Sequence, residues 1–340
     1  MNVSEIEVPD RTDIESMSID KLGDIGGMKL LLNVDTNGKK LDDWSKSNAP
    51  HIQRLLSENG ALLLRGLKIN SSKQFACLLE TLFAGPLLEY KYRSTPRTAF
   101  KGNVYTATEY SNVEVIPQHN ENAYSRSWPN RIGFLCMLPS ETGGATPISD
   151  SRYICENLPT ALLQKFEQKG VMYVRNYSNI DLPWSEVFQT EDRQQVEQYC
   201  DANQISYQWL DDNKLRTTQI NPAVVNHPVS GEKLWFNQAH LFHVSSLDPE
   251  IKKTMLDSFC ETDLPRNTFF GDGSSIDKSD LDIIRALYAE STIRFDWQKH
   301  DLLLLDNMLF THGRESYTGA RKVITGMANA NEQANVPVGA

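Results

Sequence analysis

Apolar residues recur at helical spacing in several stretches of the chain, which predicts amphipathic helices. These stretches are residues 39–58, 71–83, 159–170, 192–203 and 277–290. Residues that are typical of helix ends flank several of these stretches. Gly60 and Gly170 stand just past two of the stretches, and Ser71 or Ser72 is placed to cap another. The pattern therefore predicts helices distributed along the chain rather than gathered at one end.

Short apolar runs bounded by turn residues predict strands between and after these helices. They are residues 61–67, 131–138, 292–297, 301–306 and 321–327. Strands that are spread through the chain, with helices interspersed irregularly, favour a mainly β protein with flanking helices, either a sandwich or an open barrel. No glycine-rich phosphate loop follows a predicted strand, so a nucleotide-binding fold lacks its main signal.

The organisation of the chain is simple, because the sequence contains neither an internal repeat nor a clear linker. We predict a single domain over residues 26–335. The preceding residues, 1–25, are polar and acidic and lack the charged-then-apolar order of a signal peptide. We expect them to form a flexible N-terminal tail.

Composition and charge exclude several classes of function. The chain has 44 acidic and 34 basic residues, a formal net charge of -10, so no global field draws it to nucleic acid or anionic lipid. No apolar run is long enough to span a membrane. The 5 cysteines are odd in number and widely spaced, which favours reduced thiols in a cytoplasmic protein over a disulfide framework or zinc cluster.

One pair of residues suggests metal chemistry. His119 and Glu121 are two positions apart, and on an extended strand such residues point to the same face. One metal ion could take both from a single edge. A third ligand from a distant strand would complete a 2-His-1-carboxylate face with open positions on iron. Taken alone, the His-x-Glu pattern is weak, and a surface or core histidine remains the simpler interpretation.

The surroundings of this pair strengthen the metal hypothesis. Thr146 closes a Gly-Gly-Ala-Thr segment downstream, and His312 lies near the C-terminus. Arg321, at the start of the next predicted strand, can present a planar fork to a carboxylate. Iron alone has no need of such an arginine. An iron-bound 2-oxo diacid does, because its far carboxylate would otherwise be unpaired in a dry pocket.

Together, these motifs resemble the taurine dioxygenase superfamily of Fe(II)- and 2-oxoglutarate-dependent oxygenases in order and spacing. The likeness is greatest to the branch that contains the syringomycin aspartyl hydroxylase and the dapdiamide epoxidase, and it covers roughly residues 50–330. The segments that carry it are Arg93-Ser94-Thr95-Pro96-Arg97, Val104-Tyr105-Thr106, His119-Asn120-Glu121, Trp235-Phe236-Asn237-Gln238-Ala239-His240-Leu241-Phe242-His243 and Gly271-Asp272-Gly273-Ser274.

The resemblance implies a distorted double-stranded β-helix, or jelly roll, with the metal inside one mouth. It implies that His119, Glu121 and His312 bind Fe(II), and that Thr146 and Arg321 bind the distal carboxylate of 2-oxoglutarate, with O2 as the second cosubstrate. Much of the superfamily has Asp where this chain has Glu121, but the branch accepts Glu. Related halogenases have Ala or Gly there to make room for chloride, so Glu121 argues against halogenation.

Substrate-binding residues are harder to identify. Arg93 and Arg97, in a loop before the metal strand, are candidates to grip a substrate carboxylate or phosphate, and solvated loop charges are the equal alternative. Asn237 is a candidate pocket residue, although buried amides more often satisfy backbone groups. His240 and His243 could be a second metal pair, but no carboxylate lies close in sequence and packed histidines are the simpler interpretation.

The expected function is hydroxylation or epoxidation of an amino-acid-derived substrate in specialised metabolism, such as antibiotic or nonribosomal peptide synthesis. In the most similar members of the branch, the substrate is an aminoacyl group on a carrier protein. Carrier domains are usually acidic, as this chain is, so a free amino acid or small acid is the alternative substrate. A non-catalytic metal- or ligand-binding jelly-roll protein is the third hypothesis, and it gives no reason for a 2-oxoglutarate clamp at Thr146 and Arg321.

Overall fold

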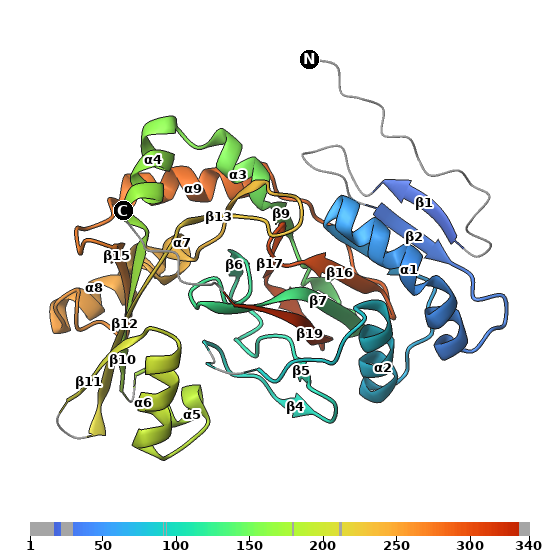
Figure 1. Ribbon diagram of the computed structural model, residues 1–340, viewed down its shortest axis with the longest axis horizontal. Helices are drawn as coiled ribbons and strands as arrows, with labels where there is room; N and C mark the ends of the chain where they lie inside the picture. The colour runs from blue at the N-terminus through green and yellow to red at the C-terminus, as the bar shows by residue number, and fades with distance from the viewer. Residues whose placement is uncertain are drawn as a thin grey trace.

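The computed structural model describes residues 17–21, 30–90, 92, 94–178, 180–210 and 213–332. Its largest element is an eight-stranded sheet with the order β1-β2-β3-β16-β7-β19-β5-β4 (Figure 1). Strands β2 and β3 are parallel and the other neighbours are antiparallel. The strands are β1 (Met17–Lys21), β2 (Leu30–Val34), β3 (Ala61–Arg65), β4 (Ala99–Phe100), β5 (Val104–Thr106), β7 (Ser127–Leu138), β16 (Leu302–Asp306) and β19 (Lys322–Glu332).

Helices α1 (Leu41–Asn59) and α2 (Ser72–Leu82) cover one face of this sheet. Strand β16 explains how both faces are buried. Leu302 and Leu304 belong to the core beneath the helices, whereas Leu303 and Leu305 point into the core on the opposite face. A run of four leucines is therefore the expected sequence for a strand that is buried on both sides.

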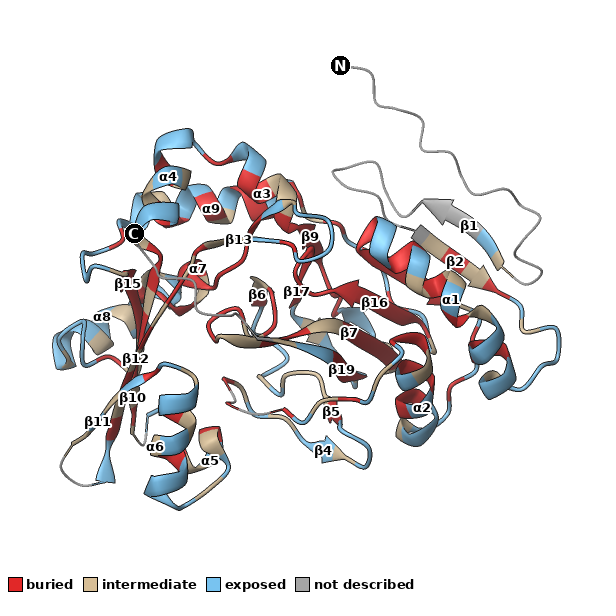
Figure 2. Cartoon of the chain, in the orientation of Figure 1, coloured by how far each residue is buried: buried red, intermediate tan, exposed pale blue. Residues whose placement is uncertain are grey.

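A three-stranded sheet of β6 (Ile116–His119), β17 (Phe310–Arg314) and β9 (Ile148–Asp150) shares that second core. Ile148 and Phe310 of this sheet pack in one cluster with residues of β3, β7 and β16. Figure 2 shows the buried positions concentrated along these central strands. The short strands β8 (Thr142–Gly143) and β18 (Tyr317–Thr318) pair beside it.

A second region, on the left of Figure 1, is built on a four-stranded sheet with the order β11-β12-β10-β15. These strands are β10 (Val171–Tyr177), β11 (Ser206–Trp209), β12 (Leu215–Asn221) and β15 (Arg266–Phe270), with the separate hairpin β13 (Val224–Asn226) and β14 (Lys233–Trp235). The helices of this region are α3 (Ser151–Asn157), α4 (Thr160–Lys169), α5 (Trp184–Phe188), α6 (Arg193–Ala202), α7 (Ala239–Phe242), α8 (Pro249–Ser258) and α9 (Lys278–Glu290), with the 3-10 turn Val244–Ser246.

The predicted helices are confirmed, with ends that differ by one or two residues. Gly60 takes the left-handed conformation that ends α1, and the Ser71 side chain accepts a hydrogen bond from the backbone N–H of Gln74 to cap α2. The predicted strand at residues 292–297 is wrong. Ile293, Phe295 and Trp297 are buried in alternation, but only Ile293 pairs, in a single bridge to Ile148.

Of the predicted flexible tail, residues 1–25, only Met17–Lys21 lies within the described residues. There the chain forms β1, which pairs with β2 at the edge of the large sheet. Backbone pairing of a polar stretch at a sheet edge leaves no strong side-chain pattern, which explains why the sequence did not reveal it. Among the described helices, none is long and apolar enough to cross a membrane.

Candidate active site

The fold brings His119, Glu121 and His312 together from distant parts of the chain. His119 ends β6 and is the direct cross-strand partner of His312 on β17, and their ring centroids are 4.6 Å apart. Glu121 follows two positions after His119. One ligand atom from each residue lies within 4.8 Å of the others, and within the described chain this is the one such group of three potential ligands. The geometry fits a single metal ion.

The hydrogen bond of His119 leaves one ring nitrogen available. Its Nδ1 lies 2.8 Å from the carbonyl oxygen of Pro117. A carbonyl only accepts, so Nδ1 carries the proton and Nε2 carries the lone pair. Burial, and then the neighbouring His312, lower the pKa of His119 to about 3, so the ring is neutral near pH 7. A neutral imidazole whose far nitrogen donates to a carbonyl is the form that binds metals.

Glu121 is paired with Arg97. One guanidinium nitrogen lies 2.7 Å from Glu121 Oε2, and the two side chains are only 5% and 4% exposed. The same Oε2 is 3.6 Å from His312 Nε2. Burial would raise the pKa of Glu121, but the charge of Arg97, and then the neighbouring His312, hold it well below its usual range. Glu121 is therefore an ionised carboxylate at neutral pH.

The backbone of Glu121 is fixed by Asn307. Its side-chain oxygen accepts from the Glu121 N–H at 2.7 Å, and its NH2 group donates to the Glu121 carbonyl at 3.0 Å. In return, the Asn120 NH2 group donates to the Asn307 carbonyl at 2.6 Å. The loop that carries Glu121 is thus tied to the turn between β16 and β17, which leads to His312.

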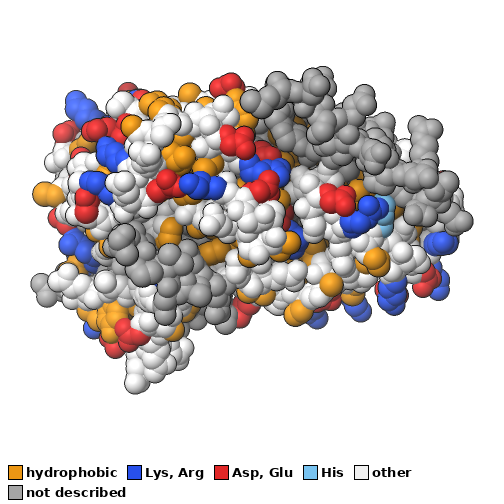
Figure 3. All heavy atoms as spheres, turned by 45° about the horizontal axis from the view of Figure 1, so that its top comes forward, with side chains coloured by type: hydrophobic (Ala, Val, Ile, Leu, Met, Phe, Trp, Pro, Cys, Tyr) orange, Lys and Arg blue, Asp and Glu red, His pale blue; other side chains and the backbone are white. Residues whose placement is uncertain are grey.

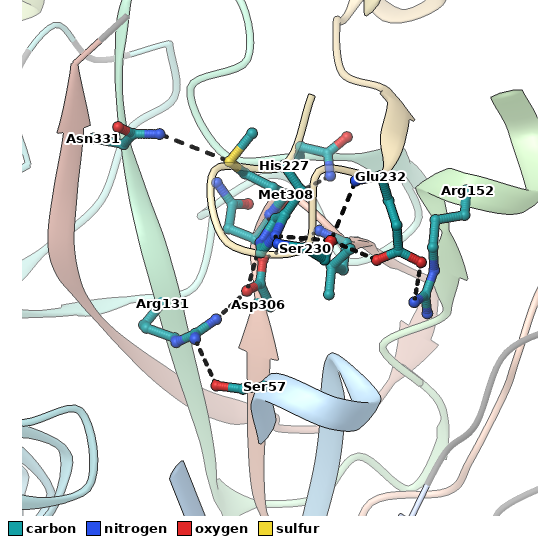
Figure 4. Close-up of polar contacts among 12 residues, drawn as sticks. Ser57, Arg131, Arg152, His227, Ser230, Glu232, Asp306, Met308 and Asn331 are labelled. Carbon is teal, nitrogen blue, oxygen red and sulfur yellow. Dashed lines mark hydrogen bonds and ion pairs between the residues drawn. The ribbon is translucent and has the colours of Figure 1, made fainter. Parts of the chain in front are cut away.

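That turn is supported by the buried carboxylate of Asp306 (Figure 4). Asp306 Oδ1 accepts from the backbone N–H groups of Met308 and Leu309 at 3.0 and 3.2 Å. Its Oδ2 contacts Arg131 and lies 3.3 Å from His227 Nε2. Burial alone would raise the pKa of Asp306, but His227 and Arg131 lower it. These contacts hold the turn in place on the large sheet.

Arg321 and Thr146 are adjacent, as the sequence predicts. Arg321 Nε donates to the carbonyl of Gly144 at 2.9 Å, and a terminal guanidinium nitrogen lies 3.4 Å from Thr146 Oγ1. Trp297 Nε1 donates to the same hydroxyl at 3.1 Å. Gly144 has φ +71, and a Cβ there would lie 3.1 Å from the Arg321 side chain, so glycine permits this close approach.

A cavity of about 30 Å³ connects this pair with the histidines, since His119, His312, Thr146 and Arg321 all line it. Arg314 also lines it, but its guanidinium donates to four backbone carbonyls of residues 108–114 and therefore supports the wall. Burial, and then the charge of Arg314, lower the pKa of Arg321 to about 10. Among the described residues no carboxylate pairs with Arg321, so its charge is available to an anionic ligand.

A second, larger pocket of about 330 Å³ also contains His119. Gln238 lines it, and its wall includes an ion pair between Arg266 and Asp181. Helix α8 lies over it with Ile251 and Met255, although no residue of that helix is buried. The other lining residues are mainly apolar, among them Ile116, Leu241, Phe242, Val244, Leu247 and Leu264.

The structure places the candidate substrate residues Arg97 and Asn237 in different surroundings. Arg97 contacts Glu121, as described above, and Arg93 lies outside the described residues. Asn237 is fully buried, its NH2 group donates to the Ala223 carbonyl, and its oxygen accepts from the Ala239 N–H. Both ends of its amide thus satisfy backbone groups, which is the alternative that the sequence analysis left open for Asn237. Its neighbour Gln238 lines the pocket instead.

His240 and His243 have separate partners. His240 Nε2 bonds the Gln118 carbonyl at 2.9 Å, and His243 Nδ1 lies 2.8 Å from the Ser245 hydroxyl. Burial lowers the pKa of each to about 4. These contacts are those of packed neutral histidines.

Sequence reasoning missed Asn307, Asp181 and Arg266. Asn307 lies beside the distal motif, but its role depends on a contact with Glu121 from far along the chain. Arg266 and Asp181 belong to no motif, and only the packing of β15 brings them to the pocket. No local signal distinguishes such residues from surface charges.

The comparisons with known proteins agree with this geometry. Residues 27–328 match the family model described as "Taurine catabolism dioxygenase TauD, TfdA family". Dapdiamide synthesis protein DdaC of Enterobacter agglomerans is 39% identical over 294 residues, covering 86% of this chain and 88% of that protein. Clavaminate synthase-like protein At3g21360 of Arabidopsis thaliana is 28% identical, covering 83% of this chain and 85% of that protein.

Solved structures share the fold at low identity. A taurine dioxygenase from Burkholderia xenovorans superposes with a TM-score of 0.55 at 14% identity, over 95% of this chain and 96% of that chain. PvcB, described as an Fe, alpha-ketoglutarate dependent oxygenase, gives a TM-score of 0.53 at 16% identity, over 92% and 90%. With the family model matched over most of its length, this chain belongs to the TauD/TfdA family and is an Fe(II)- and 2-oxoglutarate-dependent dioxygenase.

Proposed function

We propose that His119, Glu121 and His312 hold the Fe(II), and that Thr146 and Arg321 hold the distal carboxylate of 2-oxoglutarate. The observation that carries this assignment is the cavity that joins the two histidines to Arg321 and Thr146. When bound, iron and its cosubstrates supply the oxidation of a substrate C–H or C=C bond, with 2-oxoglutarate converted to succinate and CO2. The protein supplies orientation and a dry site.

His119 also determines where the substrate lies. It lines both the small cavity and the 330 Å³ pocket, so a molecule in the larger pocket lies beside the proposed metal position. The apolar lining of that pocket excludes water from the reacting carbon. Gln238 borders the same space, and its NH2 group donates to the Asn120 carbonyl at 2.7 Å, which links the pocket wall to the metal loop.

The substrate we propose is a small amino-acid-derived molecule, hydroxylated or epoxidised in specialised metabolism. The similarity to a dapdiamide synthesis protein supports this substrate class. An aminoacyl group on a carrier protein is the first candidate form. An open groove of about 1090 Å³ shares Ile180 and Pro265 with the substrate pocket, so a flexible tether in the groove could deliver its end to the pocket.

A free amino acid or small acid is the second candidate form, and the charge of the chain favours it. The net charge of -10 opposes long-range attraction to an acidic carrier. On the left and centre of the face shown in Figure 3, acidic and basic side chains are interspersed, whereas basic side chains are more frequent along the lower right edge. Carrier docking would then depend on short-range contacts.

The fold that accompanies this function is the distorted jelly roll. The shared core of the eight-stranded and three-stranded sheets, with the metal residues at the mouth formed by β6 and β17, supports this interpretation. We also retain a single oxygenase domain over residues 26–335, which the family match over residues 27–328 supports.

Mass spectrometry of reactions with Fe(II), 2-oxoglutarate and air tests the proposal. Candidate amino acids are supplied both free and as carrier-bound thioesters, with the His312→Ala variant as the matched inactive control. We expect one form to gain an oxygen atom, with one succinate formed per product. If no amino-acid-derived candidate stimulates succinate formation above the substrate-free rate, the proposed substrate class is wrong.

A further inference from the structure

Two side chains near the start of α7 bind backbone carbonyls on either side of His119. Gln238 Nε2 donates to the Asn120 carbonyl at 2.7 Å, and His240 Nε2 donates to the Gln118 carbonyl at 2.9 Å. His119, the proposed metal ligand at the end of β6, stands between these two carbonyls in the sequence. The first turn of α7 is therefore held directly against the strand that carries His119.

The hydrogen bond to Asn120 fixes which way the Gln238 amide points. A carbonyl only accepts, so the end of the amide that faces it is the NH2 group, and Oε1 is the other end. The Gln238 backbone N–H donates to the Tyr173 hydroxyl at 2.8 Å, which holds the residue from a second side. Gln238 is only 2% exposed and lines the 330 Å³ pocket together with His119. The amide is therefore a fixed part of the pocket wall.

The amide oxygen of Gln238 has no hydrogen-bond donor among the described residues. It is not sealed in the interior, as the unpaired side-chain oxygens of Asn120 and Asn221 are. Because the rest of Gln238 is buried and the residue lines the pocket, this oxygen opens onto the pocket. The Asp181 carboxylate, another acceptor in the wall, is already paired with Arg266. An unpaired acceptor in a mainly apolar pocket is unfavourable until a ligand supplies a donor.

The acceptor character of Gln238 Oε1 determines which end of an amino acid can face it. An ionised carboxylate only accepts hydrogen bonds, and its charge is repelled by the partial negative charge of the amide oxygen. An amine or amide nitrogen carries N–H groups and donates. An amino-acid-derived molecule keeps such a nitrogen whether it is free or is an acyl group on a carrier. The nitrogen therefore faces Gln238, and the acyl end lies toward Ile180 and Pro265, which the pocket shares with the open groove.

We propose that Gln238 Oε1 accepts a hydrogen bond from an N–H of the substrate and thereby determines which part of the substrate lies beside His119. The inference rests on the proposed function, because it places the substrate next to the proposed metal position. Asn120, to which the Gln238 amide is bound, stands between His119 and Glu121 in the sequence. The carbon atoms closest to the bound nitrogen are therefore the ones held closest to the proposed metal.

Two nitrogens of an amino acid can supply this donor, the α-amino nitrogen and the nitrogen of a side-chain carboxamide. Derivatives of L-leucine and L-glutamine distinguish them. The α-N,N-dimethyl and α-N,N,N-trimethyl forms of either amino acid both carry a positive charge on the nitrogen, but only the dimethyl form has an N–H there. In the same way, the side-chain N-methyl amide of L-glutamine has one N–H and the N,N-dimethyl amide has none. Each pair thus differs by one methyl group and one donor, with the charge unchanged.

Calorimetry on the protein loaded with Co(II) and 2-oxoglutarate measures the binding of these probes without turnover. We expect the member of a pair that keeps its N–H to bind about tenfold more tightly, because the other member leaves the Gln238 oxygen unpaired in the pocket. A preference within the α-nitrogen pairs identifies the α-nitrogen as the donor. A preference within the side-chain pair identifies the carboxamide. The preference is a ratio of dissociation constants in one protein, so it does not depend on the folded fraction of a preparation.

The Gln238→Met variant removes both ends of the amide at similar side-chain length and should abolish the preference. The Gln238→Glu variant keeps an acceptor oxygen without the donor to Asn120, and it should keep the preference. The matched control is His240→Phe, which removes the equivalent bond to the Gln118 carbonyl from a buried residue that lines neither the substrate pocket nor the small cavity. This control should also keep the preference, since it loosens the same strand and leaves the pocket acceptor in place.

The outcomes separate this inference from the proposed function. If the wild type binds Co(II) and 2-oxoglutarate but binds no probe, or binds both members of every pair equally, the role of Gln238 is wrong and the metal assignment stands. The same conclusion follows if Gln238→Met keeps the preference, or if His240→Phe loses it equally. If the wild type binds neither Co(II) nor 2-oxoglutarate, the proposed function itself fails, and this inference fails with it.

Discussion

The two sheet regions of this protein bury different kinds of side chain. In the large sheet, β3 and β16 are lined by leucines that are fully buried on both faces. In the second region, the strands β10, β12 and β15 bury polar and charged side chains alongside apolar ones. These are Arg175, Thr217, Gln219, Asn221, Asn267 and Thr268.

This difference suggests different roles for the two regions. We call the large sheet with its two cores the frame, and the second region, built on β10, β11, β12 and β15, the recognition surface. Apolar side chains on both faces of the large sheet are closely packed and depend on complementary shape rather than on polar partners. This packing gives a rigid base for the turn that leads to His312. Buried polar groups must each find a partner, which reduces their net contribution to stability and limits which ligands fit beside them. In the proposed assignment, the frame holds the residues for the metal and 2-oxoglutarate, and the second region contributes to the proposed substrate pocket.

The largest expected effect on activity comes from substituting the proposed metal ligands of the frame. His312→Ala removes one of the proposed ligands and should abolish Fe(II)-dependent succinate formation and Co(II) binding while the fold remains. Circular dichroism establishes the fold, and equilibrium dialysis measures the metal. Glu121→Ala should behave in the same way. Full 2-oxoglutarate turnover by the Glu121→Ala variant would mean that the proposed ligand set is wrong.

Asp306→Ala should lower the free energy of unfolding by about 3 kcal/mol, the scale for breaking a buried ion pair. It removes the partner of Arg131 and His227 and the carboxylate oxygen that accepts from two backbone N–H groups in the turn before His312. The pKa of Asp306 is lowered, so its contribution is present at neutral pH and is lost only as the pH falls through the folded pKa. Urea titration measures the change. An unchanged midpoint would show that the Asp306 carboxylate does not stabilise the frame.

Arg321→Ala should raise the 2-oxoglutarate requirement by about 10- to 100-fold, since it removes a charge-assisted contact. Lys322→Ala is the matched control, because Lys322 is exposed and lies over the Phe100 ring rather than in the cavity. Initial-rate kinetics with varied 2-oxoglutarate measure the effect. An increase confined to the KM of the primary substrate would instead assign Arg321 to substrate binding. The frame would then take part in substrate recognition as well.

Arg97→Ala should weaken Co(II) binding by about tenfold, the lower end for loss of a residue that orients a metal ligand. Without Arg97, Glu121 loses the contact that fixes its carboxylate, and Arg97→Lys should restore part of the affinity. The visible spectrum of the Co(II) protein provides a second measurement of ligand geometry. Tighter metal binding in Arg97→Ala would show instead that the arginine competes with the metal for Glu121.

The smallest effect is expected in the second region. Thr268→Val on β15 removes a buried hydroxyl that donates to the Ala239 carbonyl at 3.1 Å. It should cost about 1 kcal/mol of stability, as typical for one hydrogen bond, and leave Co(II) and 2-oxoglutarate binding unchanged. Thermal unfolding and dialysis together test this. A loss of metal binding would show that the two regions are not independent.

The sequence predicted the frame better than the recognition surface, for physical reasons. Helix ends such as Gly60 and Ser71 depend on local backbone needs, so they are visible in the sequence. His119 and Glu121 are two positions apart in sequence, at the end of β6 and in the turn after it, and the segments containing Thr146, His312 and Arg321 formed a recognisable set. The approach of His119 to His312 required only that two strands pair, as β6 and β17 do.

The rest depends on packing between distant segments. Arg97 was a candidate substrate residue, with a solvated loop charge as the equal alternative, and the sequence showed nothing of its pairing with Glu121, which is a tertiary contact. The alternation of Ile293, Phe295 and Trp297 imitates a strand because burial on one face is shared by strands and by extended segments that pair only once. Arg266 and Asp181 gave no local signal at all.

Helix α8 lines the proposed substrate pocket without a single buried residue. Ile251 and Met255 would therefore contact a molecule bound there while contributing little to the folded core. Substitutions at these two positions can change the volume and shape of the pocket at small thermodynamic cost, because surface positions tolerate change. An oxygenase lineage built on this frame can thus acquire new substrates by drift in one exposed helix, with the iron chemistry inherited unchanged.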